Sequence, residues 1–329
     1  MHCDTPRDLP RDLQRTMHSA LFRTLMLVFV TVSALTLPAS TTSAQPAPST
    51  QRAQLTAKFR ERLAEIARST DGVVGIGVID LQSGERFGVN DTLVFPQGSA
   101  IKIPILVELF RQASAGALSL DERVSVRAAD QVGGTGVINW FGDGLSMISL
   151  RDLAVLMIVL SDNTATNILI DKVGMAAVNS TMATLGVPSI RLQRKMIQPR
   201  ESAAGRENIA TPLHAASLME RIHRCDLPMP AARCAELRRI LEIPKAGAFP
   251  SAVPSSVRVA WKPGAVEGVE TSWGLFALPG NAYIVTAMVN YSDGPAGDRA
   301  LRLVAEAAYE YFRRLARSTP FGVRVGTAG

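Results

Sequence analysis

The pattern of hydrophobic and polar residues predicts strands in two parts of the chain, one toward each end. Apolar residues recur at helical spacing over 52–68, and a continuous apolar run over 73–81 is typical of a buried strand. Residues 86–90 follow a turn and are predicted to pair back as a hairpin. Strand patterns return at 256–261, 272–278 and 283–291. A final amphipathic helix is predicted over 298–316.

The middle of the chain, about 99–254, has the periodicity of helices instead. The predicted helices cover 100–115, 149–160, 163–171, 175–185, 212–223 and 231–242. The simplest packing of this order is a five-stranded antiparallel sheet, flanked by helices and made by both ends of the chain, with an all-helical part beside it. We therefore expect an α/β protein whose α/β part covers about 52–98 and 255–317.

Residues 1–44 have the pattern of a secretory signal peptide. Arg15 and Arg23 precede an apolar run at 24–37, and small residues follow it. The run is short and rich in threonine for a membrane anchor, and an uncleaved anchor is the alternative. The sequence therefore predicts cleavage, a mature chain over 45–329 that is periplasmic or secreted, and no stable insertion into the membrane.

Composition and charge narrow the class of partner. The chain is 47% hydrophobic and 19% charged, an ordinary soluble profile, and its 329 residues can enclose a sizeable core. The net charge of +6 comes from scattered basic residues, with no basic run interleaved with aromatic ones. This distribution argues against a nucleic-acid partner. We expect a monomer that acts on a small molecule.

Histidine and cysteine usage bears on metals and on the redox compartment. Of the four histidines only His214 and His223 lie in the predicted mature chain, and no Cys-x-x-Cys or His-Glu-x-x-His is present. We therefore expect no metal and no cofactor. Cys225 and Cys234 are the only cysteines of that mature chain. An oxidising compartment would allow them to form a disulfide, and two free buried thiols are the alternative.

The candidate chemistry starts with Ser99-Ala-Ile-Lys102. A spacing of three residues on a helix puts the hydroxyl and the amine on one face. The serine would lie in the first turn, where free N–H groups favour developing negative charge. A lysine desolvated beside other cations has a lowered pKa and can act as a base. Alone, the pattern is more typical of a pair on a surface helix.

Two further motifs follow. Ser161-Asp-Asn163 comes directly after the most apolar predicted helix. Its hydroxyl can relay a proton and its amide can bind a carbonyl, although all three residue types also favour a helix N-cap. Lys262-Pro-Gly264 is predicted at the end of a strand, where a cation can bind a carboxylate and glycine allows close approach to a ligand. Lys245-Ala-Gly247 has the same spacing but lies in a predicted loop.

In this order the three motifs resemble the Ser-x-x-Lys, Ser-Asp-Asn and Lys-Thr-Gly set of class A β-lactamases and penicillin-binding proteins. Further matches to the class A helical core lie at 134–138, 149–153 and 161–170. The resemblance extends from about residue 55 to 316. It implies an α/β part and an all-α part with the site between them, which agrees with the predicted order of elements.

The resemblance also implies catalytic roles. Ser99 would attack the acyl carbonyl, Lys102 would take its proton directly or through water, and Ser161 would pass a proton to the leaving nitrogen.

Substrate-binding roles follow in the same way. Asn163 would bind the substrate's side-chain amide, and Lys262 would attract its carboxylate. The N–H groups of Ser99 and Ala265 would form the oxyanion hole, beside the close-approach residue Gly264.

Two departures concern the carboxylate end of the site. The middle residue of the third motif is Thr or Ser in the family, and its hydroxyl grips the carboxylate, whereas Pro263 offers neither a hydroxyl nor an N–H. The strand after this motif often carries an arginine in the family, and here that place holds Ser272 and Trp273.

A third departure concerns release of the acyl group. Class A β-lactamases activate the deacylating water with a glutamate after a Leu-x-Arg stretch, and an asparagine follows four residues later. Those positions fall on Met196 and Arg200 here, and a thioether cannot act as a general base. Glu201 is the candidate replacement base and Glu207 a second one, although each is also explained by a solvated surface.

The sequence therefore favours an exported serine hydrolase that forms an acyl-enzyme through Ser99. The leading hypothesis is a class A-like β-lactamase that hydrolyses β-lactam amides. One alternative is a D-Ala-D-Ala peptidase or esterase of the same fold, and another is a non-enzymatic β-lactam-binding protein.

Overall fold

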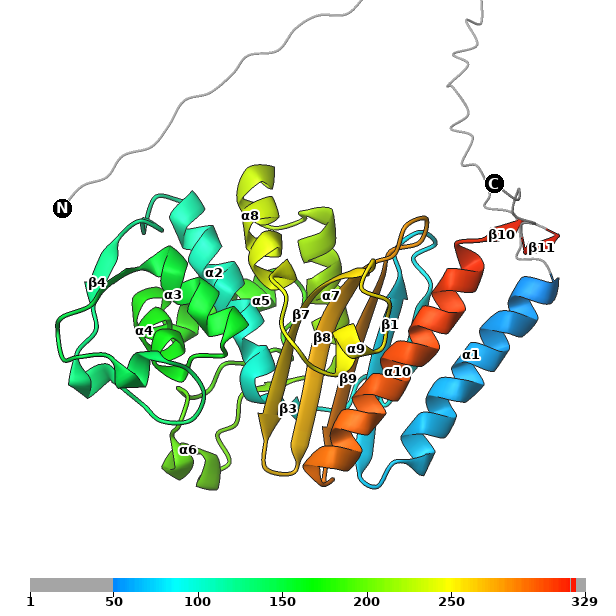
Figure 1. Cartoon of the computed structure of the whole chain (residues 1–329), viewed down its shortest axis with the longest axis horizontal. Coiled ribbons are helices and arrows are strands. Elements are labelled where there is room, and N and C mark those ends of the chain that lie inside the picture. The colour runs from blue at the N-terminus through cyan, green and yellow to red at the C-terminus, as the bar shows by residue number, and fades with distance from the viewer. Residues whose placement is uncertain (1–49, 320, 324–329) are drawn as a thin grey trace, which may run out of the picture. The chain divides into compact units, whose positions relative to one another are not determined.

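Strands from both ends of the chain form one antiparallel sheet in the order β2-β1-β9-β8-β7 (Figure 1). The computed structural model describes residues 50–319 and 321–323, and the predicted signal peptide lies outside them. The strands are β1 (Val73–Asp80), β2 (Arg86–Val89), β7 (Arg258–Val266), β8 (Val269–Ala277) and β9 (Tyr283–Asn290). The predicted five-stranded antiparallel sheet is confirmed.

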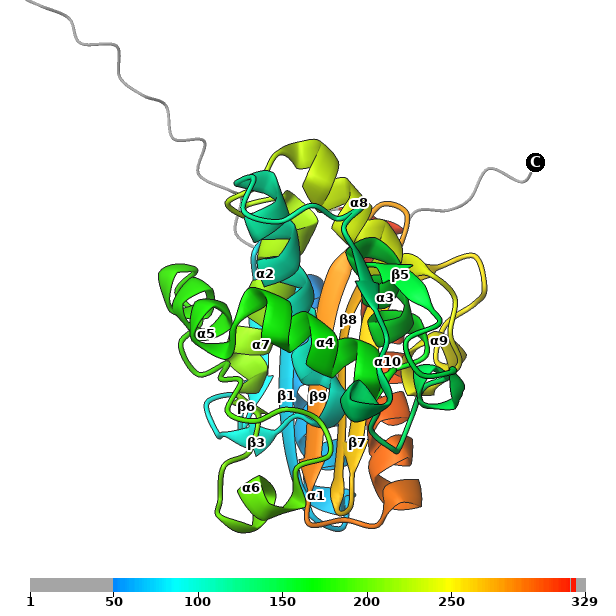
Figure 2. The same ribbon diagram turned by 90° about the vertical axis from the view of Figure 1, so that its left-hand side faces the viewer.

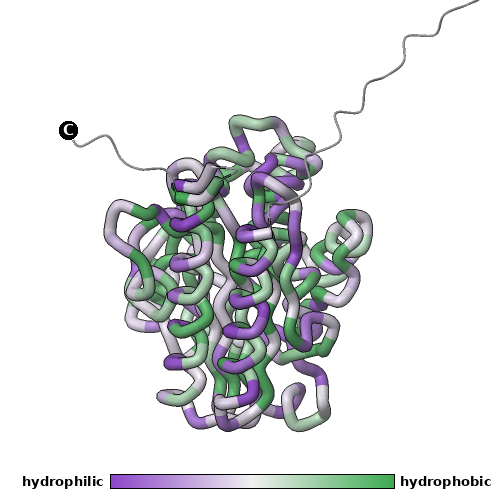
Figure 3. The backbone as a smooth tube through the Cα atoms, turned by 90° about the vertical axis from the view of Figure 1, so that its right-hand side faces the viewer, coloured by the Kyte–Doolittle hydropathy of each residue, from purple (hydrophilic) through white to green (hydrophobic). Residues whose placement is uncertain are grey.

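Helices from the two ends of the chain cover one face of this sheet. They are α1 (Thr50–Ser69) and α10 (Gly294–Leu315). The short α9 (Ala248–Ser251), from the segment predicted as the helical part, packs on this side with α10. Figure 3 views the molecule from this side, with polar and apolar positions alternating along the helices as the sequence pattern requires. Phe59 of α1 stacks on Tyr311 of α10 with ring centroids 4.3 Å apart, so the core joins both chain ends.

The other face carries the helical middle of the chain. Figure 2 looks from this side and shows α4 in front of the sheet. The helices are α2 (Lys102–Ser114), α3 (Leu150–Val159), α4 (Asn163–Val173), α5 (Met175–Thr184), α6 (Pro199–Ala203), α7 (Pro212–Arg224) and α8 (Ala231–Glu242). Helix α7 packs directly on β1 and β9, so the segment predicted as the helical part, 99–254, also helps to cover the sheet.

Short elements complete the described chain. Paired strands are β3 (Phe95–Pro96) with β6 (Ile209–Ala210), β4 (Arg123–Ser125) with β5 (Met147–Ser149), and β10 (Ser318–Thr319) with β11 (Gly322–Val323). Three 3-10 turns cover Gly98–Ile101 (η1), Ala128–Asp130 (η2) and Ile138–Trp140 (η3).

The third sequence motif was predicted at the end of a strand, but it lies inside one. Strand β7 continues through Lys262 and Pro263 to Val266, with Pro263 opposite Ser272 of β8. A proline normally weakens a strand because it cannot donate to the ladder. In the described sheet β7 is an edge strand, and an edge strand has one side that needs no ladder partner.

Candidate active site

Ser99 lies in the turn η1, directly before α2, whose first residue is Lys102. Residues three apart in a 3-10 turn eclipse each other, so this spacing places the hydroxyl and the amine on one side. Pro104 stands in the first turn of α2, where its missing N–H leaves no helical hydrogen bond unmade. The serine therefore precedes the α-helix instead of forming part of it.

Strand β7 passes unusually close to this turn at Gly264. A Cβ added there would lie 2.3 Å from the oxygen of Gln97 and 2.7 Å from the nitrogen of Ser99. In the same way, a Cβ on Gly98 would lie 2.8 Å from the nitrogen of Ala265. The two glycines therefore bring the backbone of β7 against the backbone of η1. The N–H groups of Ser99 and Ala265, predicted as the oxyanion hole, belong to these touching segments.

The turn between α3 and α4 carries the second motif. Ser161 has a left-handed backbone with φ of +55°, which is uncommon for a residue other than glycine. Asp162 is the N-cap of α4: its carboxylate accepts from the N–H of Ala165 at 2.8 Å and from those of Val137 and Ile138 at 2.7 and 2.9 Å. Within this motif Asp162 is therefore the N-cap, and Ser161 is free to be the candidate for proton transfer.

Two lysines converge on the Ser161 hydroxyl. The Nζ of Lys102 lies 3.1 Å from Ser161 Oγ and also donates to the Ser161 carbonyl at 2.7 Å and to Asn163 Oδ1 at 3.0 Å. On the other side, the Nζ of Lys262 lies 3.1 Å from the same Oγ and donates to the Pro263 carbonyl at 2.9 Å. These contacts bring three sequence motifs, more than 150 residues apart at the extremes, to one atom.

Burial disfavours the protonated form of both amines. It lowers the pKa of Lys102 to about 7, partly offset by the negative charge of Asp162. Burial also lowers the pKa of Lys262 well below its usual value, and the positive charges of Lys102 and Lys245 add to this effect. Near neutral pH an amine of this kind can accept a proton, as a general base must.

Residue Thr135 anchors this arrangement from a loop. Its hydroxyl donates to the Ser161 carbonyl at 2.7 Å, and its own carbonyl accepts from the Asn163 N–H at 3.0 Å. The Asn163 amide also donates to the carbonyl of Gly133 at 3.1 Å. No role for Thr135 could be predicted, because a loop threonine carries no signal of which carbonyl it will contact.

A cavity of about 890 Å³ opens beside these groups. The predicted site residues in its lining are Ser99, Ser161, Asn163, Lys262, Gly264 and Ala265. Lys102 is fully buried and does not line it. A space of this size and mixed character is typical of small-molecule sites.

The model of the family described as "Beta-lactamase enzyme family" matches residues 58–312. The chain belongs to this family. The resemblance inferred from the three motifs is therefore confirmed.

Curated relatives include a beta-lactamase of Rhodobacter capsulatus, 29% identical over 53% of this chain and 59% of its own length. Another is beta-lactamase CARB-3 of Pseudomonas aeruginosa, 29% identical over 45% of this chain and 52% of its own. The chain thus spans about half the length of the curated relatives it matches.

Solved structures of the beta-lactamase fold match more of the chain. A beta-lactamase from Sphaerobacter thermophilus DSM 20745 is 32% identical, with a TM-score of 0.71 over 78% of this chain and 97% of that one. A mutant of PBP-A, solved as an acyl-enzyme complex with penicillin G, is 26% identical, with a TM-score of 0.71 over 79% and 97%. The predicted beta-lactamase-like α/β fold is confirmed.

The loop around Met196, which was predicted at the place of the deacylation glutamate, is held by Asn167 of α4. Met196 lines the cavity, and its backbone N–H and carbonyl are both bound by the Asn167 amide, at 2.8 and 3.1 Å. These two hydrogen bonds hold the backbone of Met196 at the wall of the cavity. A thioether therefore occupies a well-defined part of the wall.

The candidate replacement base Glu201 does not line the cavity. It lies on the short helix α6 and forms an ion pair with Arg206, which lowers the pKa of its carboxyl. Glu207 does line the cavity, but its carboxylate accepts from Arg194 at 2.8 Å and from the Ser202 hydroxyl. Both carboxylates are therefore committed to partners within their loop.

The positions that differ from the family on β8 face away from each other. Trp273 is fully buried and donates from Nε1 to Gln97 Oε1 at 2.9 Å, directly behind the turn that holds Ser99. Ser272 is opposite Pro263, and its hydroxyl is buried without a partner in the described chain. Trp273 is thus part of the core and does not line the cavity.

Gln97, which was not predicted as a site residue, connects the site to the sheet. Its side chain is buried and donates to the carbonyls of Phe95 and Ala210 at 2.8 and 3.3 Å. Its own carbonyl accepts from the Thr271 hydroxyl at 2.9 Å. A lone glutamine before a serine has no sequence signal that would separate it from a surface residue.

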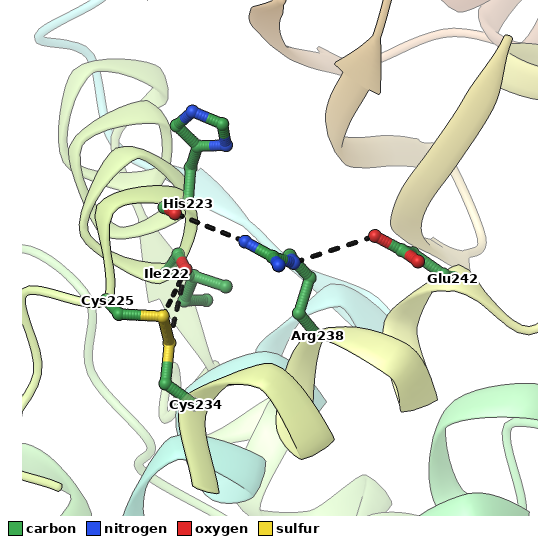
Figure 4. Close-up of a disulfide and its surroundings, with 6 residues drawn as sticks. All are labelled: Ile222, His223, Cys225, Cys234, Arg238 and Glu242. Atoms are coloured by element: carbon green, nitrogen blue, oxygen red, sulfur yellow. Dashed lines mark hydrogen bonds and ion pairs between the residues drawn. A yellow bond between two sulfur atoms is a disulfide. The ribbon is translucent and has the colours of Figure 1, made fainter. Parts of the chain in front are cut away.

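Cys225 and Cys234 form a disulfide with their Cα atoms 5.7 Å apart (Figure 4). The bond joins the end of α7 to the start of α8, and the intervening residues turn the chain back. Within the described residues no group of acidic, histidine or cysteine side chains could hold a metal ion, and no helix is long and apolar enough to cross a membrane.

Proposed function

We propose that this chain is a serine hydrolase of the β-lactamase type that forms an acyl-enzyme through Ser99. The single observation that carries the proposal is the convergence of Lys102 and Lys262 on the Ser161 hydroxyl, in a cavity that Ser99 also lines. Lys102 would take the proton of Ser99, and Ser161 would return one to the leaving nitrogen. The N–H groups of Ser99 and Ala265 would stabilise the oxyanion.

The substrate would be a small β-lactam or another activated acyl compound. Asn163 would bind the amide of the acyl side chain, and Lys262 would attract a carboxylate next to the leaving group. Pro263 supplies no hydroxyl to that carboxylate, so we expect weaker binding of it than in relatives with Thr or Ser.

The proposal includes a slow second step. Met196 stands where a water-activating glutamate is expected, and Glu201 does not line the cavity. These observations favour the second candidate as well, a peptidase or esterase that uses the same acylation machinery. Turnover of β-lactams would then be limited by deacylation.

Mass spectrometry of the intact protein after a pulse of penicillin G tests the proposal. The wild type should gain the mass of one penicillin on the peptide that contains Ser99, and the adduct should persist after the drug is removed. The Ser99→Ala variant should gain nothing. A protein that binds penicillin reversibly, without any adduct, would instead support the non-enzymatic alternative.

We also propose that the protein is exported and that it is a monomer. The predicted leader and a disulfide between Cys225 and Cys234 both fit an oxidising compartment outside the cytoplasm. Fractionation with N-terminal sequencing of the mature protein tests the predicted cleavage, and light scattering tests the monomer.

A further inference from the structure

One buried hydroxyl connects the two chain segments that carry the proposed oxyanion N–H groups. Thr271 of β8 is fully buried, and its Oγ1 donates to the carbonyl of Gln97 at 2.9 Å. The same Oγ1 lies 3.2 Å from the carbonyl oxygen of Gly264 on β7. Gln97 directly precedes the turn that contains Ser99, and the Gly264 carbonyl belongs to the same peptide unit as the Ala265 N–H. The hydroxyl therefore holds η1 and β7 together.

The contact with Gly264 sets the direction of the Ala265 N–H. In a trans peptide the C=O and N–H groups point in opposite directions. The Gly264 oxygen points to the buried Thr271, so the Ala265 N–H points away from it, toward the cavity that Ala265 lines. The Ala265 nitrogen would lie 2.8 Å from a Cβ added to Gly98, so this N–H group lies directly beside η1.

The contact with Gln97 holds the turn of Ser99. The Gln97 carbonyl accepts from the Ala100 N–H at 3.0 Å, which closes the 3-10 turn, and also from Thr271 Oγ1. A carbonyl oxygen has two lone pairs, so both are used. The side chain of Gln97 is held as well, because its Oε1 accepts from Trp273 Nε1 at 2.9 Å. Two residues of β8 thus fix the backbone from which the Ser99 N–H projects.

A glycine in this peptide makes the contact important. Gly264 has no Cβ, so rotation of the peptide between Gly264 and Ala265 meets little steric resistance. A rotated peptide would turn the Gly264 oxygen into the cavity, where it would repel a developing oxyanion. Pairing of β7 with β8 opposes this rotation, and the Thr271 hydroxyl adds a contact at the carbonyl oxygen itself. Away from water such a contact is strengthened.

We propose, resting on the proposed acyl-enzyme, that Thr271 is a positioning residue for acylation. Its hydroxyl keeps the Gly264–Ala265 peptide in one orientation and ties it to the turn of Ser99, so that both N–H groups stay directed at one point. Thr271 does not line the cavity and acts only through these N–H groups. Loss of the hydroxyl should therefore slow formation of the acyl-enzyme without weakening the initial binding of substrate.

The neighbouring strand offers a matched control. Thr286 of β9 is also fully buried, and its Oγ1 donates to the carbonyl of Pro212 at 2.9 Å and lies 3.2 Å from that of Gly77. This hydroxyl connects α7 and β1 instead, and neither Thr286 nor its two partners line the cavity. Thr→Val replaces a hydroxyl by a methyl group at either position, so a general loss of packing should affect both variants alike.

Pre-steady-state acylation by a chromogenic β-lactam tests the proposal. Thr271→Val should lower the acylation rate constant by roughly 10- to 100-fold and leave the dissociation constant of the first complex within about twofold of wild type. Thr271→Ser, which keeps the hydroxyl, should retain most of the rate. Thr286→Val should acylate as the wild type does, although its urea midpoint should fall about as far as that of Thr271→Val.

Infrared difference spectroscopy of the acyl-enzyme reports on the N–H groups directly. A β-lactam with an isotopically labelled lactam carbonyl identifies the ester band of acylated Ser99, and hydrogen bonds to that carbonyl lower its stretching frequency. Thr271→Val should move the band to higher frequency. Thr271→Ser and Thr286→Val should keep the wild-type band.

The outcomes are distinct. An unchanged acylation rate and ester band in Thr271→Val overturn the inference alone. Equal slowing in Thr271→Val and Thr286→Val also overturns it, because lost packing would then explain both. If Thr271→Val does not fold, Thr271→Cys takes its place, since a thiol is only a weak donor. If the wild type gives no adduct on Ser99, the proposed function fails first and this inference fails with it.

Discussion

Gly264 shows how a residue without a side chain can set the geometry of a site. It was expected to let the backbone approach a ligand, but its close neighbours are the protein's own atoms in the turn that holds Ser99. A methyl group at this point would push β7 and η1 apart. The two N–H groups proposed to bind the oxyanion lie on either side of that contact.

Gly264→Ala should therefore lower the rate of acylation by at least about 100-fold, as loss of an oxyanion donor does. Overpacking should also lower the free energy of unfolding by roughly 1–3 kcal/mol. Acylation by a chromogenic β-lactam and urea denaturation measure the two effects. Gly294→Ala is the matched control, since its nearest atom would lie at an ordinary 3.6 Å, and it should change neither.

The lowered pKa of Lys102 predicts that the rate of acylation depends on pH. Its pKa is lowered from 10.5 to about 7, so the amine is mostly uncharged above that pH and mostly protonated below it. Because only the uncharged amine can take the proton of Ser99, the acylation rate should rise through about pH 7 and then level off.

Stopped-flow acylation with a donor that does not titrate in this range measures the profile. The Lys102→Met variant, which keeps the length of the side chain but has no amine, should be slow at every pH. A wild-type rate that does not change across pH 7 would falsify the assignment of Lys102 as the base.

At the scale of elements, the start of α4 is the most heavily constrained helix end in the site. Asp162 is almost fully buried and accepts three backbone N–H groups, one from its own helix and two from the loop that carries Thr135. The left-handed residue Ser161 precedes it. This cap therefore fixes the position of the Ser161 hydroxyl relative to the 131–138 loop.

Asp162→Ala should cost roughly 3 kcal/mol of unfolding free energy, because it leaves buried N–H groups without acceptors. Asp293→Ala removes an exposed N-cap whose carboxylate, within the described residues, accepts a single N–H group, that of Ala296, and should cost about 1 kcal/mol. Chemical denaturation of the two variants compares them. Equal losses would mean that the two loop contacts of Asp162 add nothing.

The disulfide is a second constraint between elements. It closes a loop with a sequence separation of nine residues, so replacing Cys225 and Cys234 by alanine should cost roughly 2–3 kcal/mol. Neither residue lines the cavity, and acylation should be unchanged. Reducing agent should reproduce the loss in the wild type and have no further effect on the double variant, as followed by urea denaturation.

At the scale of the whole molecule, aromatic packing ties the two ends of the chain together. Phe59 from α1 lies against Phe87 from β2 and against Tyr311 and Phe312 from α10. Phe59→Ala should therefore lower the free energy of unfolding by roughly 3–5 kcal/mol in a single transition. Leu93→Ala, at a side chain 48% exposed, should change it by less than about 0.5 kcal/mol. Circular dichroism and fluorescence should report coincident transitions.

The features that the sequence could predict are those with local signatures. Period-two and helical patterns placed the strands and helices, and the spacing of Ser99 to Lys102 and of Ser161 to Asn163 is set within single turns. The roles of Gln97 and Thr135 could not be predicted, because these residues bind partners more than 20 residues away in the sequence. The partner of Glu201 is Arg206, and no spacing rule indicates that a residue of the short helix α6 will pair with one in the following loop.

The position of Lys262 has a consequence for when the protein becomes reactive. This lysine is held by a strand whose sheet closes only when β9 pairs with β1, Asn290 opposite Val73. During synthesis the ribosome releases Ser99 and Lys102 long before these last strands. Contacts so distant in sequence form late, so an unfolded chain crossing a membrane would carry an inert serine. In the proposed export, the nucleophile would become reactive only after the C-terminal strands had crossed the membrane and folded.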